Sequence, residues 1–164
     1  MQIFILDTNP KQSAQWLCDK HVVKQILESA QILTHVAHHF GSKTPPYKDF
    51  PKQYHKHPCT IWTKESKQNY LWLIEHALEI CKEYTARYGK IHKTQSVIEW
   101  CKDNVPEKLL DIGQTPHAIA IKKHLYSHLI VPNDPVTTYR NYYVADKVSF
   151  AKWKRNKPFW WPYP

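Results

Sequence analysis

The chain has 164 residues, of which 42% are hydrophobic and 13% aromatic. This composition excludes a disordered protein, and the length predicts one domain spanning residues 1–164 with a proper core. The formal net charge of +9 favours nucleic acid or another polyanion as the partner.

The N-terminal residues and the cysteines indicate a cellular setting. The chain opens with a short apolar run that has no basic leader, which is not typical of a signal peptide, and no stretch approaches the ~18 apolar residues of a membrane span. The four cysteines are widely spaced and form no Cys-x-x-Cys pair, which favours a reducing compartment. We therefore expect a cytoplasmic protein without a membrane partner, in the host cytoplasm if a phage encodes it.

The first strong element is a long helix over residues 9–40. Asn9 is a good N-cap, Pro10 suits the first helical position, and Gly41 supplies a C-terminal stop. The preceding segment, 2–6, is either a short strand or an apolar lead-in to the core.

This helix has two chemically different sides at ~100° per residue. One side is apolar and comprises Cys18, Val22, Ile26, Ala30, Leu33 and Val36. The other carries a narrow polar stripe made of Lys20, His21, Lys24, Glu28, Gln31 and His35. A narrow polar stripe on a mostly apolar helix indicates a groove or pocket, although a Lys–Glu pair at this spacing is also common on ordinary solvated surfaces.

The rest of the chain follows as shorter pieces. Residues 41–57 are rich in proline and lysine, which predicts an extended basic loop. A second long helix is expected over 58–88, closed by Gly89, and a short third helix over 94–104. A last helix begins near 135, and residues 155–164 form an aromatic, proline-rich tail.

Two other chemistries were weighed. A metal site could draw on histidines near the end of the first helix or on a pair four residues apart (His35, His38, His39, His124, His128), but no accompanying metal-binding motif is present. Cys59 lies near a helix start, where a thiolate is stabilised, although a buried structural cysteine is the commoner case. We therefore predict no metal and no cofactor, and the three glycines leave no phosphate-cradling loop.

The polar stripe offers an amine beside a carboxylate. That pair is what a DNA glycosylase with lyase activity requires, because the amine attacks the sugar C1′ and displaces the base while the carboxylate stabilises the cationic sugar and moves protons. Lys24 and Glu28 would supply the two groups, with His21 and Gln31 beside them. The target base must also leave the helix stack, which calls for a basic cleft with an aromatic-lined pocket.

The segments DKHVVKQILE, HPCTIW, NYLWL, RYGKIHK and YRNYY resemble a group of small phage-borne proteins. More distantly, the order of elements resembles the phage pyrimidine-dimer DNA glycosylase (endonuclease V) family. The resemblance implies a compact all-α fold in which an early helix carries the catalytic carboxylate. TPHAIAI and the segment from Tyr139 to Tyr143 would be its later counterparts.

Two features depart from the family pattern, the residue at position 2 and the pair at positions 22 and 23. The family's nucleophile is the α-amine of a threonine exposed by removal of the initiator methionine, whereas residue 2 is Gln, which usually prevents that removal. Either the Met1 amine serves, or Lys24 does, or the chemistry has been lost. Val22 and Val23 occupy the positions of the family's Arg-Glu pair, so Glu28 is a substitute by its place on the helix face.

We interpret the chain as an all-α glycosylase/lyase acting on damaged or modified pyrimidines. The alternatives are a non-catalytic binder of nucleic acid or of a small phosphorylated nucleotide, such as a phage counter-defence protein, and an enzyme acting on N-glycosidic bonds of free nucleotides. The predicted catalytic residues are Met1, His21, Lys24, Glu28 and Gln31. The predicted DNA- or phosphate-binding residues are Lys20, His57, Arg87, Lys90, His92, Lys93, Tyr139, Arg140, Tyr143 and Lys147.

Overall fold

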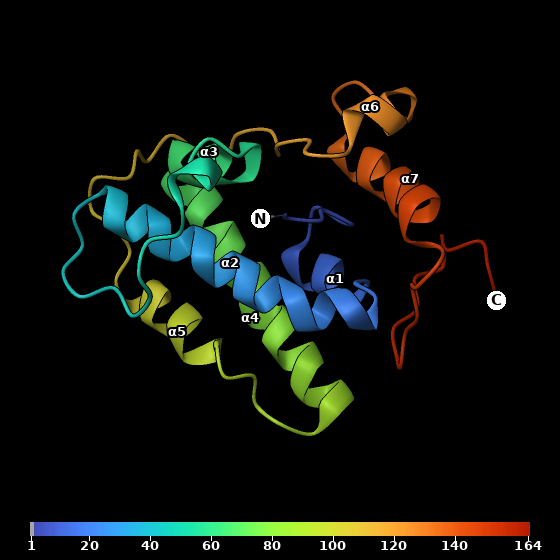
Figure 1. Cartoon of the computed structure of the whole chain (residues 1–164), viewed down its shortest axis with the longest axis horizontal. Coiled ribbons are helices and arrows are strands. Elements are labelled where there is room, and N and C mark those ends of the chain that lie inside the picture. Colours follow the sequence, from blue (N-terminus) through green and yellow to red (C-terminus); the bar gives the residue numbers. More distant parts are fainter. Residues whose placement is uncertain (1) are drawn as a thin grey trace.

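The computed structural model describes residues 2–164, which contain seven α-helices and no strand (Figure 1). The expected all-α class, with two long helices and several shorter ones in one compact domain, is confirmed. Within the described residues no helix combines the length and the hydropathy needed to cross a lipid bilayer.

The first predicted helix is divided into two, α1 (Pro10–Gln15) and α2 (Asp19–His39). Asn9 caps α1 as expected, because its Oδ1 accepts hydrogen bonds of 2.9 and 3.2 Å from two backbone N–H groups of the first turn. The apolar face predicted for this stretch is fully buried along α2. The prediction therefore had the right face but missed the break between the two helices.

The second predicted helix is also divided, into α3 (Pro58–Glu65) and α4 (Lys67–Tyr88). Ser66 stands between them in an extended conformation, and its hydroxyl accepts a 3.1 Å hydrogen bond from the backbone N–H of Asn69. Serine caps of this kind start a new helix rather than continue an old one. Gly89 ends α4 with φ 67°, a left-handed conformation that glycine adopts without strain.

The other elements are short. The basic loop 41–57 contains only the 3-10 turn η1 (Lys52–Tyr54), and the tail 155–164 contains no helix. The remaining elements are α5 (Gln95–Asp103), α6 (Lys123–Tyr126), the 3-10 turn η2 (Ser127–Leu129) and α7 (Pro135–Lys147).

Helix α4 forms the centre of the core, with α1, α2, α3 and α5 packed on it. The segment 2–6 forms no strand, and its four apolar side chains from Ile3 to Leu6 are buried. This segment lies between α2 and α7 (Figure 1), and the Nε of Arg140 on α7 donates a 2.8 Å hydrogen bond to the Leu6 carbonyl. The start of the chain is therefore packed inside the domain.

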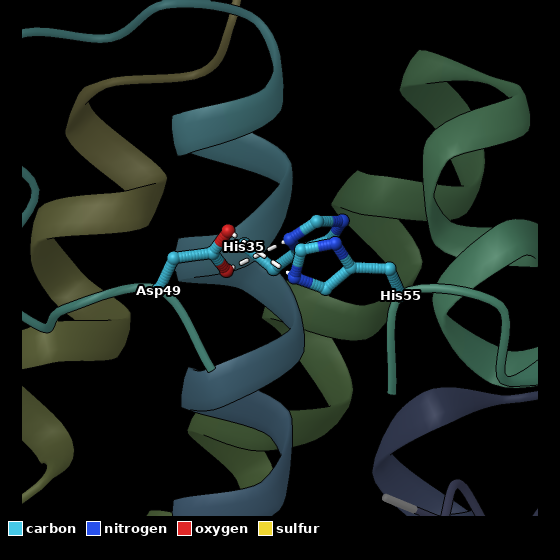
Figure 2. Close-up of side chains that lie close together, drawn as sticks. All are labelled: His35, Asp49 and His55. Atoms are coloured by element: carbon cyan, nitrogen blue, oxygen red, sulfur yellow. Dashed lines mark hydrogen bonds and ion pairs between the residues drawn. The ribbon is translucent and has the colours of Figure 1, made fainter. Parts of the chain in front are cut away.

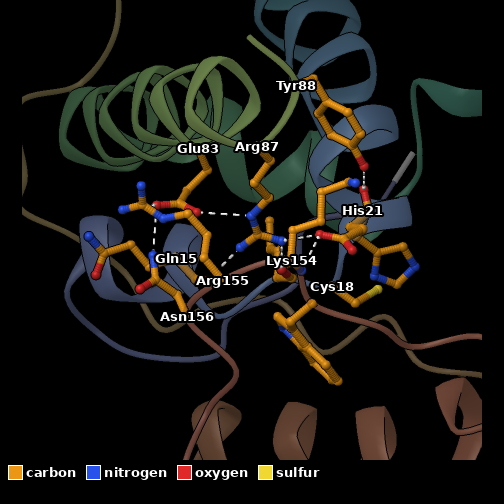
Figure 3. Close-up of polar contacts among 12 residues, drawn as sticks. Gln15, Cys18, His21, Glu83, Arg87, Tyr88, Lys154, Arg155 and Asn156 are labelled. Carbon is orange, nitrogen blue, oxygen red and sulfur yellow. Dashed lines mark hydrogen bonds and ion pairs between the residues drawn. The ribbon is translucent and has the colours of Figure 1, made fainter.

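A buried guanidinium joins the helices to the tail. Arg87 reaches from α4 toward Gln15 and toward the tail (Figure 3), and its Nη2 donates a 2.9 Å hydrogen bond to the Gln15 carbonyl. Its Nη1 donates to the Leu17 carbonyl at 2.8 Å and to Asp19 at 2.9 Å, and its Nε donates to Glu83 at 3.0 Å. All three nitrogens of the guanidinium are thus used within the fold.

We expect Arg87→Met to lower the free energy of unfolding by about 3–5 kcal/mol, because it leaves two carboxylates without their buried partner. Urea unfolding measures this change. Lys82→Met is the matched control, since Lys82 is an exposed member of an ion pair on the same helix and its loss should cost no more than about 1 kcal/mol. Equal losses in the two variants would show that the buried network contributes no more than a surface pair.

Candidate active site

Glu28 lies on α2 at the point where the start of the chain crosses that helix. Its Oε2 accepts a 3.1 Å hydrogen bond from the backbone N–H of Gln2 and a 2.7 Å hydrogen bond from the side-chain amide of Gln25. The carboxylate is half-buried, so reacting groups can reach it. Met1, whose amine is one of the predicted nucleophiles, lies outside the described residues.

Tyr139 on α7 holds the other side of Gln2. The tyrosine hydroxyl accepts from the Gln2 side-chain amide at 3.3 Å and from the backbone N–H of Ala120 at 3.0 Å, and it donates to the Ala118 carbonyl at 2.9 Å. Because Tyr139 is fully buried, this hydroxyl is a fixed anchor. Its contacts place segment 118–120 beside Gln2, the residue that contacts Glu28.

A pocket of about 360 Å³ opens next to this contact, between the start of α3 and the chain around Ala120. Its polar lining consists of His57, Lys122, Lys123 and His124. Lys122 is paired with an aspartate on α7, with a nitrogen–oxygen distance of 3.1 Å, whereas Lys123 and His124 are exposed. The pocket can therefore hold a group that carries negative charge at its edge.

His57 lines the pocket at the start of α3. It is the N-cap of α3, where its Nδ1 accepts a 3.2 Å hydrogen bond from the backbone N–H of Cys59. Burial lowers the pKa of His57, and the Glu28 carboxylate opposes that shift. Burial raises the pKa of the Cys59 thiol to about 11, so this cysteine stays protonated and is not a nucleophile.

His21 belongs to the core. Its ring stacks on Phe4 with the centroids 4.4 Å apart, and its Nδ1 lies 2.6 Å from the hydroxyl of Tyr143. Burial lowers the pKa of His21 to about 3, and three neighbouring lysines act in the same direction. The imidazole is therefore neutral at physiological pH and fastens α2 to the N-terminal segment and to α7.

The other residues of the predicted stripe are closer to solvent. Lys24 is exposed, and Gln31 is half-buried. Lys20 is also exposed, and its Nζ lies 4.5 Å from the centroid of the Phe150 ring. The structure therefore gives Lys24 no enclosed pocket of the kind that activates a lysine nucleophile.

Four C-terminal residues expected to contact DNA are instead engaged within the fold. Tyr139 and Tyr143 are fully buried. Arg140 donates to the Leu6 carbonyl, and the Nζ of Lys147 lies 2.6 Å from an aspartate of α7. Aromatic rings contribute large buried areas, which explains why this aromatic and cationic helix packs inward.

The basic residues at the end of α4 separate into two groups. Arg87 belongs to the buried network, because its side chain is 0% exposed, and so it leaves the phosphate-binding set. Lys90 and Lys93 are exposed, and His92 is half-buried between them. Burial lowers the pKa of His92, and a hydrogen bond to the backbone of Val23 opposes this, which places the basic turn beside α2.

Sequence reasoning missed Gln25, which is 3% exposed and donates to Glu28. The available signal was its spacing of three residues from Glu28 on one helix, a separation at which an amide and a carboxylate meet. The contact between Gln2 and Glu28 had no comparable signal, because the two residues are 26 positions apart.

The sequence model of the pyrimidine dimer DNA glycosylase family matches residues 1–96. The chain belongs to this family. The match covers the N-terminal segment and α1 to α4, and so includes Gln2, Gln25, Glu28 and His57, whereas TPHAIAI and α7 lie outside it. The chain matches no curated protein and no solved structure. Membership in the glycosylase family supports a DNA glycosylase-type function at the family level.

The buried His21 of this glycosylase-family protein predicts acid sensitivity. Its pKa of about 3 in the folded state lies below the unfolded value of about 6.5, so between these values the unfolded chain binds a proton that the folded one does not. Stability is therefore lost as the pH falls through this window. We expect His21→Gln to reduce the slope of unfolding free energy against pH by up to about 1.4 kcal/mol per pH unit.

Chemical unfolding at several pH values between about 4 and 6 measures this slope. His128→Gln changes an exposed histidine and should leave the slope unchanged. The buried His76 and the half-buried His117, whose pKa values burial lowers to about 3 and about 4, still contribute acid sensitivity in both variants. A His21→Gln slope equal to that of the wild type would refute the assignment.

Proposed function

We propose that this protein is a DNA glycosylase/AP lyase that acts on damaged or modified pyrimidines through a Schiff base. The N-terminal α-amine is the nucleophile, and Glu28 is the carboxylate. The observation that carries the proposal is the 3.1 Å hydrogen bond between the Gln2 backbone nitrogen and Glu28 Oε2, which brings the beginning of the chain to that carboxylate. The family match over residues 1–96 supports the reaction class.

The chemistry uses the two groups in sequence. The neutral amine attacks C1′ of the damaged nucleoside, and the bond to the base breaks with its electron pair leaving on the base, which takes a proton from water. The sugar ring then opens to the protonated imine as the ring oxygen accepts a proton. Glu28 stabilises the positive charge that develops on the sugar and accepts the proton released by the amine. Loss of a proton from C2′ then expels the 3′ phosphate, which is the lyase step. Gln25 holds the carboxylate in position through its 2.7 Å hydrogen bond.

An α-amine suits this role better than Lys24. The ordinary pKa of an α-amino group is about 7.7–8.0 against about 10.4 for a lysine amine, so a much larger fraction of it is neutral near pH 7. Lys24 is exposed and lacks the enclosed surroundings that would activate it. We assign Lys24 instead to phosphate binding.

The DNA would be held by exposed lysines and the target base by the neighbouring pocket. Lys20 and Lys24 on α2 and Lys90 and Lys93 beyond α4 are exposed, and they can neutralise phosphates on both sides of a lesion. The extruded base would enter the pocket of about 360 Å³ lined by His57 and Ala120, because the Tyr139 hydroxyl that binds the Ala120 backbone also binds the side chain of Gln2.

Borohydride trapping tests the proposal directly. The protein is mixed with ultraviolet-irradiated duplex, with abasic-site duplex and with undamaged duplex, and the covalent protein–DNA product is resolved by gel. We expect a product with the first two substrates, and a loss of about 10²–10⁴ in the excision rate for Glu28→Gln, the range for a removed acid–base group. Lys24→Ala should retain trapping, whereas a short Gly-Ser extension ahead of Met1 should abolish it.

Peptide mapping of the reduced product identifies the amine that was modified. An adduct on Lys24 would overturn the choice of nucleophile and leave the reaction class standing. Full base excision by Glu28→Gln, or no product with any substrate from folded protein, would refute the glycosylase mechanism and favour a non-catalytic binder.

The salt dependence of DNA binding tests the lysine assignment. For duplex DNA, each phosphate contact contributes about 0.9 to the slope of log affinity against log salt concentration. We expect Lys93→Ala to reduce the slope by about that amount, measured by fluorescence anisotropy. Lys82→Ala, an exposed lysine on α4 that is paired with Glu79, is the control and should leave the slope unchanged. Identical slopes in both variants would exclude Lys93 from the interface.

A further inference from the structure

Three potential metal ligands meet where the basic loop 41–57 packs on α2. Figure 2 shows the carboxylate of Asp49 facing the rings of His35 and His55. The Nδ1 of His35 lies 2.8 Å from one carboxylate oxygen, and the Nε2 of His55 lies 3.3 Å from the other. One ligand atom from each residue lies within 4.8 Å of the other two.

The donor types and distances fit Zn²⁺. Zinc binds histidine nitrogen and carboxylate oxygen at about 2.0–2.2 Å in a tetrahedral arrangement, which separates neighbouring ligand atoms by about 3.3 Å. The two nitrogen–oxygen distances of 2.8 and 3.3 Å are close to that separation, so small side-chain movements suffice. Two imidazoles and one carboxylate favour zinc over Mg²⁺ or Ca²⁺, which prefer oxygen ligands throughout.

The cluster also has the rigidity and the access that a binding site needs. His35 has a side chain that is 4% exposed, and it stacks with His55 at a centroid separation of 4.1 Å, so its position is fixed by α2. Asp49 is 33% exposed and His55 28% exposed, so an ion from solvent can reach both. A fixed ligand on a helix and two accessible ligands on a loop allow the loop to close over an ion.

Lys64 on α3 lowers the affinity of the cluster for zinc. Its Nζ lies 3.3 Å from the Nε2 of His35, the ring nitrogen opposite the one that faces Asp49. A hydrogen bond from the amine to this nitrogen requires the proton of the neutral ring to sit on Nδ1, the atom that zinc would need. Zinc binding at Nδ1 therefore moves that proton to Nε2 and breaks the hydrogen bond with Lys64. The positive charges of Lys64 and of the zinc ion also repel each other, which weakens binding further.

We propose that His35, Asp49 and His55 form a zinc site, with water as the fourth ligand, that clips the basic loop 41–57 onto α2. The site is separate from Glu28 and takes no part in the glycosylase chemistry proposed above. Its effect on the loop extends to His57, two residues beyond His55, which lines the pocket next to the contact between Tyr139 and Ala120. The zinc thus acts as a positioning device for one wall of that pocket.

Direct titration tests the site on the full chain without a histidine tag. The protein is freed of metal with a chelator and titrated with ZnCl₂ by calorimetry, with MgCl₂ as the comparison ion. We expect one zinc per chain and no magnesium binding. Asp49→Asn and His55→Gln should each weaken zinc binding by at least about tenfold, because changing even a partner of a metal ligand typically costs about 10–100-fold in affinity.

Two variants make the result specific. His128→Gln removes an exposed histidine away from the cluster and should bind zinc as the wild type does. Lys64→Met removes the competing amine and should tighten zinc binding severalfold. Thermal melting without metal establishes that each variant is folded, which keeps a loss of binding interpretable.

Hydrogen exchange provides a readout independent of activity. Zinc should slow amide exchange in 41–57 of the wild type and leave it unchanged in Asp49→Asn. No zinc binding by the wild type, equal affinity in Asp49→Asn, or equal weakening in His128→Gln would overturn the proposal.

Discussion

The buried guanidinium of Arg87 is the constraint on which the rest of the structure depends. The break between α1 and α2 leaves backbone carbonyls without helical partners, and Arg87 donates hydrogen bonds to two of them, those of Gln15 and Leu17. Its two carboxylate partners extend the network into the tail, because Asp19 accepts from the backbone of Lys154 and Glu83 from the side chain of Asn156. The guanidinium therefore provides hydrogen bonds to the carbonyls at the end of α1, and its two carboxylate partners hold the chain around residues 154–156.

The position of the candidate site follows from this arrangement. Separating α1 from α2 lets the chain turn, so that segment 2–6 can lie against α2 rather than extend away from it. Gln2 then reaches Glu28 from one side while Tyr139 holds it from the other. His21, stacked on Phe4, fixes the same segment further along α2. The contacts of Tyr139 and His21 thus bring Gln2 and the Glu28 carboxylate together.

The periodicity of the sequence predicted the apolar face of α2 and the end of α4 at Gly89, because both depend on residues close together in the chain. It could not predict the break near Trp16, since the side chain that stabilises it lies about 70 residues further on. The polar stripe was misleading at His21 for a related reason. A tyrosine 122 residues away takes His21 into the core, so a polar residue on a helix need not face a site.

The three arginines and the exposed lysines use their positive charge differently, the arginines in contacts within the fold and the lysines at the surface. Arg87 and Arg155 pair with Glu83, and Arg140 pairs with Asp7 while its guanidinium lies 5.0 Å from the Trp16 ring centroid. A planar guanidinium can satisfy several acceptors at once and stack on aromatic rings, which suits it to internal anchoring. Charge available for a polyanion must therefore come mainly from lysine. The net charge of +9 therefore reaches the surface mainly through lysine side chains. The arginines of this chain instead form contacts between segments that are distant in the sequence.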